Sequence, residues 1–156
     1  MDEKEKQLYM KRAIALAKEG AEKYDEVPIG CVIVKDGKIV AESHNGKVSS
    51  GLATMHAEII AIERATNALG DWRLTDCSMF VTLEPCAMCT GAIVNSRVGE
   101  VYFGAYDPKA GCCGSLYNLL TDKRFNHNPK VVEGGVEEKL CADMLSEYFL
   151  KKRNKD

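Results

Sequence analysis

The sequence predicts an α/β fold in which a mixed β-sheet is covered by helices on both faces. Segments with helical periodicity alternate with short runs of β-branched and aromatic residues along the chain. Two of these runs flank Asp36-Gly37, a strong signal for a tight hairpin. The chain has 156 residues and no internal repeat or long linker, so we expect residues 1–156 to form a single domain.

The first half of the chain is predicted to form a helix, a hairpin and a second helix. Apolar residues at helical spacing predict the first helix, and β-branched residues on both sides of the Asp36-Gly37 turn predict the hairpin. A loop rich in serine and glycine precedes the second helix, which Gly70 ends. The predicted ranges are a helix to about residue 22, strands over 29–34 and 38–43, a loop over 46–51 and a helix over 55–68.

The second half alternates strands and helices again. Pro85 favours the first turn of a helix, because its fixed backbone angle suits that position. Two apolar rows predict the last helix; they are Val136, Leu140, Met144 and Tyr148, and Cys141, Leu145 and Phe149. The predicted ranges are a strand over 79–83, a helix over 85–94, a strand over 98–104, a short helix over 115–120, a short strand over 130–132 and a helix from about 136.

Composition excludes several classes of protein. The N-terminus is charged from its second residue, unlike a signal peptide, and no apolar run approaches the ~20 residues of a membrane helix. We therefore expect a cytoplasmic protein with no membrane contact. The odd number of cysteines, seven, argues for reduced thiols with a metal or catalytic role for some of them.

Charge is nearly balanced, with a formal net charge of −2, so no global field attracts nucleic acid. The end of the last helix is an exception, because residues 150–156 are strongly basic. Two interpretations are open. The cations could be a solvated helix end that the helix dipole favours, or a patch that contacts phosphates.

Two short motifs indicate a catalytic zinc site. His56 and Glu58 are predicted near the start of one helix, and Cys86 and Cys89 near the start of another. Residues three apart share a helix face, so both cysteines can reach one ion, and helix N-termini favour thiolates. One imidazole and two thiolates suit Zn²⁺ and leave a fourth position for water. Glu58, two residues after His56, is then placed to move a proton between that water and a substrate nitrogen.

Other interpretations of the same residues are possible. A Cys-x-x-Cys pair can be a redox couple, although that role does not need the His-x-Glu motif. A structural zinc site would require a fourth ligand, and a lone histidine is often a core residue. The candidates for a fourth ligand are His44, Cys112, Cys113, His127 and Cys141, none of which lies in a second paired motif.

The combination His-x-Glu and Pro-Cys-x-x-Cys is the known signature of zinc nucleobase deaminases. Here it occurs as His56-Ala57-Glu58 and Pro85-Cys86-Ala87-Met88-Cys89, and the chain resembles the bacterial tRNA adenosine deaminases of the cytidine and deoxycytidylate deaminase superfamily. The resemblance covers about residues 7 to 153. Further stretches that carry it are Val27–Gly30, Trp72–Leu74, Thr82–Glu84, Phe103–Gly111, Gly114–Leu116 and Phe125–His127.

The resemblance implies a three-layer α/β/α cytidine-deaminase-like fold with a central mixed five-stranded sheet. It also implies a homodimer with one Zn²⁺ per subunit. The implied reaction is hydrolytic conversion of adenosine to inosine at the wobble position of a tRNA anticodon stem-loop, with the target base splayed out into a pocket.

Matched positions imply roles for individual residues. His56, Cys86 and Cys89 would hold zinc, and Glu58 would be the catalytic proton shuttle. Substrate contacts are implied for Asn45, Asp107, Lys109, Asn126, His127 and Phe149, with Lys152 and Arg153 near phosphates. Each of the substrate contacts has a structural alternative: Asn45 and Asp107 are also typical turn residues, Asn126 and His127 suit an ordinary loop, and Phe149 lies on an apolar row.

One segment departs from the family. Its members usually carry Asp-Pro-Thr-Ala before the His-Ala-Glu motif, whereas this chain has Leu52–Met55. The flexible Met55 beside the first ligand could reshape the wall of the pocket. A deaminase of a free nucleobase or nucleoside, of guanine, cytosine or adenosine type, is therefore the alternative function. A non-catalytic, zinc-stabilised binding module is a third.

Overall fold

The computed structural model describes residues 1–155 and contains a five-stranded mixed sheet, as the sequence predicts. The strands are β1 (Gly30–Lys35), β2 (Lys38–His44), β3 (Cys77–Leu83), β4 (Glu100–Ala105) and β5 (Val131–Glu133). Their order across the sheet is β2-β1-β3-β4-β5. β1 is antiparallel to both β2 and β3, whereas β3, β4 and β5 run parallel to one another.

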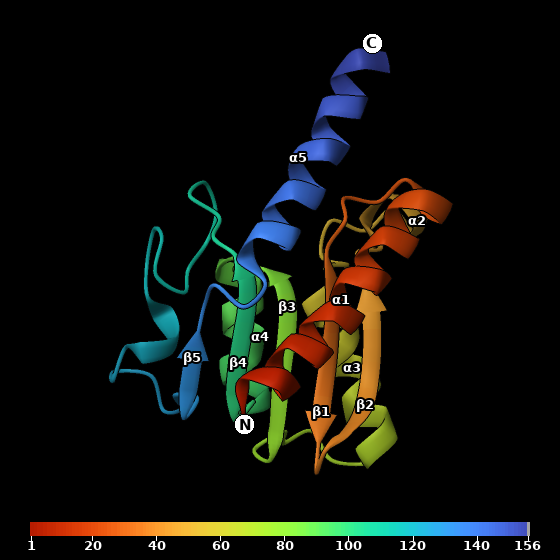
Figure 1. Ribbon diagram of the computed structural model, residues 1–156. Coiled ribbons are helices and arrows are strands. Elements are labelled where there is room, and N and C mark those ends of the chain that lie inside the picture. The colour runs from red at the N-terminus through yellow and green to blue at the C-terminus, as the bar shows by residue number, and fades with distance from the viewer. Residues whose placement is uncertain (156) are drawn as a thin grey trace.

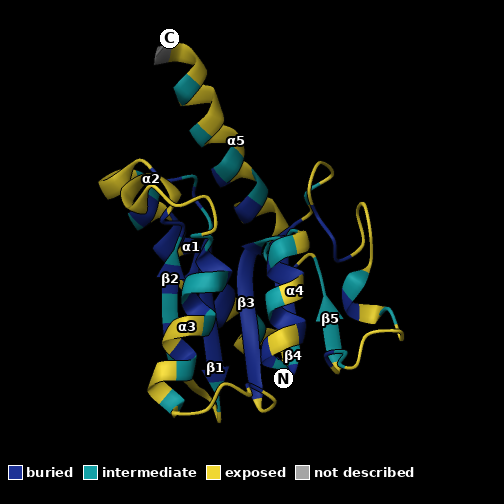
Figure 2. Ribbon diagram, turned by 180° about the vertical axis from the view of Figure 1, so that it is seen from behind, coloured by how far each residue is buried: buried dark blue, intermediate teal, exposed yellow. Residues whose placement is uncertain are grey.

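Helices cover both faces, so the molecule has the predicted α/β/α layers (Figures 1 and 2). α1 (Glu3–Tyr24) and α5 (Glu138–Lys155) pack on one face, and α3 (Ala57–Leu69) and α4 (Ala87–Ser96) pack on the other. Across residues 1–155, no helix has the length and apolar character that a bilayer span requires.

The central strands are apolar on both sides because both faces are buried. Val32, Phe80 and Tyr102 point toward α1 and α5, whereas Ile33 and Met79 point toward α3 and α4. Successive side chains of a strand alternate between its faces, so one continuous apolar run supplies both cores.

Two glycines permit close packing of helices on this sheet. A Cβ atom on Gly30 would lie 1.9 Å from the carbonyl oxygen of Ala13, so α1 can approach β1 only where a side chain is missing. A Cβ atom on Gly104 would lie 2.4 Å from the Sγ atom of Cys141 in α5. Larger residues at either position would push a helix off the sheet.

Two local predictions were wrong, and two predicted helices begin two residues later than expected. The predicted loop at 46–51 contains a short helix, α2 (Lys47–Ser50). The predicted helix at 115–120 is an irregular segment that ends in a 3₁₀ turn, η1 (Leu119–Thr121). Gly114 has a φ of 140°, which no helix contains, and its N–H donates to the carbonyl of Tyr117. The helices predicted from residues 55 and 85 begin at Ala57 and Ala87.

The last helix projects beyond the body of the molecule (Figures 1 and 2). Cys141 and Met144 are buried against the sheet, but Leu140 is 49% exposed and Phe149 is 47% exposed. The core alternative for Phe149 is therefore wrong, because this part of α5 extends past the strands that would cover it. Of the basic end predicted at 150–156, the side chain of Lys155 and all of Asp156 lie outside the described residues.

Candidate metal centre and active site

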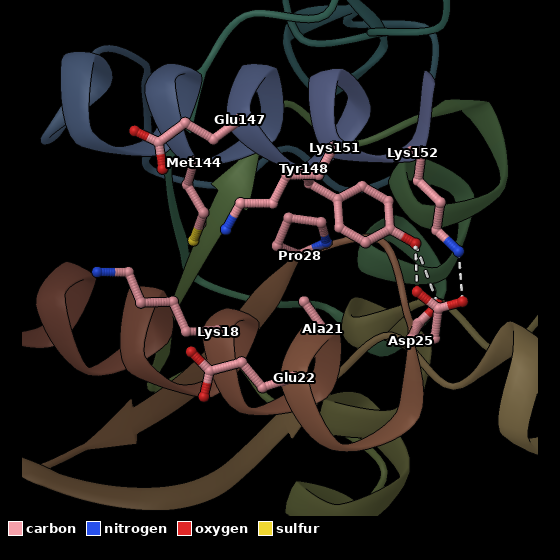
Figure 3. Close-up of a pocket in the computed structure, with 10 residues that line it drawn as sticks. All are labelled: Lys18, Ala21, Glu22, Asp25, Pro28, Met144, Glu147, Tyr148, Lys151 and Lys152. Atoms are coloured by element: carbon pink, nitrogen blue, oxygen red, sulfur yellow. Dashed lines mark hydrogen bonds and ion pairs between the residues drawn. The ribbon is translucent and has the colours of Figure 1, made fainter. Parts of the chain in front are cut away.

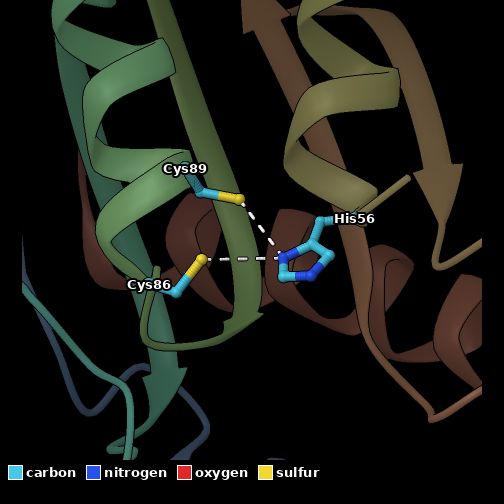
Figure 4. Close-up of side chains that lie close together, drawn as sticks. All are labelled: His56, Cys86 and Cys89. Atoms are coloured by element: carbon cyan, nitrogen blue, oxygen red, sulfur yellow. Dashed lines mark hydrogen bonds between the residues drawn. The ribbon is translucent and has the colours of Figure 1, made fainter. Parts of the chain in front are cut away.

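The candidate metal centre lies where α3 and α4 begin, at the same end of the sheet. His56 is the N-cap residue of α3, and Cys86 is the N-cap residue of α4; both have extended backbones, with ψ angles of 153° and 179°. Cys89 follows in the first turn of α4 and is buried. The two helix starts therefore bring one imidazole and two thiols together (Figure 4).

The separations of these atoms fit a tetrahedral zinc ion. With Zn–S bonds of about 2.3 Å and Zn–N bonds of about 2.0–2.1 Å, tetrahedral angles require N···S distances of about 3.6 Å. His56 Nδ1 lies 3.7 Å from Cys86 Sγ and 3.5 Å from Cys89 Sγ. Within residues 1–155, no other His, Cys, Asp or Glu joins this group, whose ligand atoms all lie within 4.8 Å of one another. The alternative of a closed structural site with a fourth protein ligand therefore finds no support here.

The charges of the three groups also suit a cation. A hydrogen bond from Cys89, aided by His56, lowers the pKa of the Cys86 thiol to about 4, so Cys86 is a thiolate at neutral pH. The same hydrogen bond raises the pKa of Cys89, because the two sulfurs share one proton. A divalent metal ion deprotonates coordinating thiols outright, so both sulfurs become available as ligands.

Glu58 lies in the first turn of α3, two residues after His56, and only 4% of it is exposed. Burial raises the pKa of this carboxyl group to about 6. A carboxyl group that exchanges a proton near neutral pH can act as both general base and general acid. His56, Cys86, Cys89 and Glu58 together can thus hold a metal ion and move protons beside it.

Residues 3–105 match the model of the family described as the cytidine and deoxycytidylate deaminase zinc-binding region. The chain belongs to this family. The motif-based prediction is therefore confirmed at the family level.

Similar proteins carry a more specific name. A curated relative from Bacillus subtilis (strain 168) is 52% identical over 96% of this chain and 91% of its own length, and is named tRNA-specific adenosine deaminase. A relative from Aquifex aeolicus (strain VF5) has the same name and is 41% identical over 96% of this chain and 97% of its own length. A solved structure from a study of A-to-I editing by tRNA deaminases at the wobble position matches with a TM-score of 0.83. Its sequence is 40% identical, over 88% of this chain and 99% of that one.

The side chain of Asn45 lies at the N-terminus of α3 in this deaminase. Its side-chain Oδ1 accepts a hydrogen bond of 3.0 Å from the N–H of Ala57, which follows His56. The side-chain amide nitrogen of Asn45 has no hydrogen-bond partner within the described chain. Asn45 therefore caps the helix that starts at the metal ligand, and it keeps two N–H donors for another group.

Glu84, to which sequence analysis assigned no role, organises the other side of the deaminase site. It directly precedes Pro85 and is 2% exposed. Its carboxylate accepts hydrogen bonds of 2.9–3.0 Å from the backbone N–H groups of Asp107, Cys113 and Ser115. It also accepts a hydrogen bond from the Ser115 hydroxyl. Burial raises its pKa, but these hydrogen bonds outweigh burial and the net pKa is lowered. An acidic residue at the end of a buried strand is the signal that would have found it.

The loop wrapped around Glu84 carries two predicted substrate contacts, Asp107 and Lys109. The Oδ1 atom of Asp107 accepts hydrogen bonds from the N–H groups of Lys109 at 3.0 Å and Ala110 at 3.2 Å. Asp107 thus shapes the turn that carries Lys109, which is exposed.

The remaining predicted substrate contacts are Asn126, His127 and Phe149. A ring nitrogen of His127, Nε2, lies 2.8 Å from the carbonyl oxygen of Val98, just before β4. Asn126 and Phe125 line a pocket together with Thr90, Gly91, Val94 and Asn95 of α4. Phe149 lies on the projecting part of α5. Substrate contact by Asn126, His127 and Phe149 stays a prediction.

The projecting part of α5 is fastened to the end of α1 (Figure 3). The hydroxyl group of Tyr148 lies 3.1 Å from the carbonyl oxygen of Asp25 and 3.3 Å from its Oδ1, and Lys152 forms an ion pair with the same carboxylate. This attachment orients α5, and it leaves Lys151 and Arg153 exposed.

Proposed function

We propose that this protein is a zinc-dependent hydrolase that converts adenosine to inosine at the wobble position of a tRNA anticodon loop. The observation that carries the proposal is the placement of His56, Cys86 and Cys89 at zinc-compatible distances beside the buried Glu58. The names of relatives that match over nearly the whole chain support tRNA adenosine as the substrate.

His56, Cys86 and Cys89 would hold one zinc ion, which when bound supplies a Lewis acid that makes water nucleophilic near neutral pH. Glu58 then takes a proton from the water as the water oxygen bonds to the amine-bearing ring carbon. It delivers a proton to the leaving nitrogen, and the carbon–nitrogen bond breaks to release ammonia. The free amide donors of Asn45 would bind and orient the target nucleotide.

The RNA-binding surface would combine cations with polar and aromatic groups around this site. Side chains of this kind stack on splayed bases and bind phosphates in single-stranded loops. The proposed contacts are Asp107, Lys109, Asn126, His127, Phe149, Lys151, Lys152 and Arg153. The exposure of Phe149 supports stacking on a base, and the exposure of Lys151 and Arg153 supports contact with the RNA backbone.

We further infer that residues 1–156 act as a single deaminase domain, in a cytoplasmic homodimer. An apolar groove between α3 and α4, on the side away from the sheet, supports self-association. Its apolar lining residues are Ile59, Ile62, Trp72 and Ala92; the polar residues that line it are Glu63, Thr66, Asn95 and Ser96. Trp72 is 53% exposed, and tryptophan is enriched at protein–protein interfaces, so this exposed ring supports a contact with a second copy. A tRNA substrate is the reason to expect a cytoplasmic location.

A substrate comparison tests the proposed reaction. The zinc-loaded protein is incubated separately with an anticodon stem-loop, free adenosine, cytidine and guanine, and inosine, uridine and xanthine are measured. We expect inosine from the stem-loop only. Faster, salt-insensitive turnover of a free base or nucleoside would replace this proposal with the alternative deaminase.

A further inference from the structure

Glu26 is a buried carboxylate outside the metal centre. It follows α1, is 0% exposed, and forms no ion pair with Lys or Arg in the described chain. Its oxygens accept hydrogen bonds from the Val48 N–H at 3.0 Å, the Ser49 N–H at 2.7 Å and the Ser49 hydroxyl at 2.9 Å. All of these donors belong to α2.

α2 depends on Glu26 because it has no other support of comparable strength. The helix has four residues, far below the length at which a helix is stable alone, and its N-cap, Gly46, has no capping side chain. Every residue of α2 is exposed, and Val48 is 63% exposed, so apolar burial contributes little. Glu26 therefore caps α2 from another part of the chain. Burial raises the pKa of Glu26, but the hydrogen bonds from Val48 and Ser49 outweigh burial and lower it, so the carboxylate stays charged.

The segment that Glu26 holds leads directly to the metal centre. The N–H of Gly46 donates to the carbonyl of Met55 at 2.9 Å, and Asn45 accepts from Ala57 at 3.0 Å, so residues 46–55 form a loop closed at its neck beside His56. Figure 1 shows α2 at the end of the sheet where α3 begins. The loop also contains Leu52–Met55, where this chain departs from the family.

We propose that Glu26 is a positioning residue for substrate binding, which fixes loop 46–55 as one wall of the substrate entrance beside Asn45. Glu26 itself does not touch substrate. Its hydrogen bonds order the loop before RNA binds. RNA binding therefore does not include the entropy cost of ordering the loop. This inference rests on the proposed function for the identity of the substrate.

The test compares Glu26→Gln with Glu22→Gln, which changes an exposed glutamate one turn earlier in the same region. Glutamine at position 26 keeps one acceptor oxygen but replaces the other with an NH2 donor, which then faces an N–H donor of either Val48 or Ser49. Amide hydrogen exchange at Val48 and Ser49 should become about tenfold faster in Glu26→Gln. KM for the anticodon stem-loop should rise about fivefold or more, while kcat changes less than about twofold and zinc content stays equal. Glu22→Gln should match the wild type in every measurement.

Unchanged exchange in Glu26→Gln would overturn the inference, and so would faster exchange with an unchanged KM. Ser49→Ala, which removes one donor and keeps Glu26, should give a smaller effect in the same direction; if Glu26→Gln does not fold, Ser49→Ala decides by the same two criteria. If the wild type does not deaminate the stem-loop, the proposed function fails. The loop inference is then decided by the same comparison on the substrate that is turned over.

Discussion

Glu58 is the residue on which the chemistry depends most directly. Glu58→Gln keeps the size of the side chain and removes its ability to transfer protons, so we expect deamination to fall by about 10²–10⁴-fold. The zinc ligands are unchanged, and zinc content measured by elemental analysis should stay at the wild-type level. Glu22→Gln is the control. Retained turnover in Glu58→Gln would assign the proton transfer to another group and favour the non-catalytic interpretation of the site.

Glu26 should also make stability depend on pH. Its folded pKa is lowered from the ordinary value of 4.5, so the folded state binds fewer protons than the unfolded state at acidic pH. The stabilisation by Glu26 is therefore complete above that value and is lost as the pH falls through the lower, folded pKa. Electrostatic attraction from His44 in β2 contributes to the lowered pKa of Glu26.

Urea unfolding of the wild type and of Glu26→Gln at pH 7 and at more acidic pH measures this effect. The wild type should be more stable at pH 7, and the difference should shrink as the pH falls below 4.5. A difference that is constant with pH would show that Glu26 acts by packing alone.

The ligand set could be predicted at this scale because spacing determines it: residues three apart on a helix converge, and the family motif supplied Glu58. The role of Glu26 could not be predicted, and neither could the hydrogen-bond partners of Glu84. Their partners are mainly backbone N–H groups of distant loops, which any sequence offers, and only the tertiary structure shows which of them lie next to a buried carboxylate.

α5 is the element whose charge can be tested separately. Lys151 and Arg153 are exposed on its projecting part, so each should release counterions when RNA binds. Replacing either one with Gln should reduce the slope of log affinity against log salt by about 1, measured by titration with a labelled stem-loop. Lys152 is already paired with Asp25, so its replacement should have a smaller effect.

The control for α5 is Lys4→Gln, an exposed lysine near the N-terminus at the opposite end of the molecule (Figure 1). It should leave the salt slope unchanged. Equal effects of Lys4→Gln and Lys151→Gln would mean that RNA responds to the total charge of the protein and does not contact α5.

Elements with an apolar pattern were predicted well, and irregular ones were not. All five strands follow from β-branched runs and turn signals. The prediction failed at 115–120 because Leu116 and Leu119 suggest a helix, while the backbone N–H of Ser115 bonds to Glu84 and Gly114 adopts a φ of 140°. Short α2 was missed because its stability comes from Glu26 and not from its own residues.

Zinc should stabilise the whole molecule, because its ligands connect α3 to α4. A ligand that binds only the folded state, and whose free concentration is about 1,000 times its Kd, adds about 4 kcal/mol to the free energy of unfolding. Removing zinc with a chelator should therefore lower Tm and speed exchange at the starts of both helices, and added zinc should restore both. An unchanged Tm would contradict a zinc ion shared between the two helices.

Trp72 gives the proposed self-association its own optical signal. It is the only tryptophan in the chain, it is half exposed in the groove between α3 and α4, and the guanidinium groups of Arg73 and Arg97 lie 5.5 and 5.9 Å from its ring centroid. Intrinsic fluorescence therefore reports on this face alone, without a label. If two copies meet there, the emission should shift to shorter wavelength as protein concentration rises, and dilution should reverse the shift; a spectrum independent of concentration would argue that this face stays in contact with water.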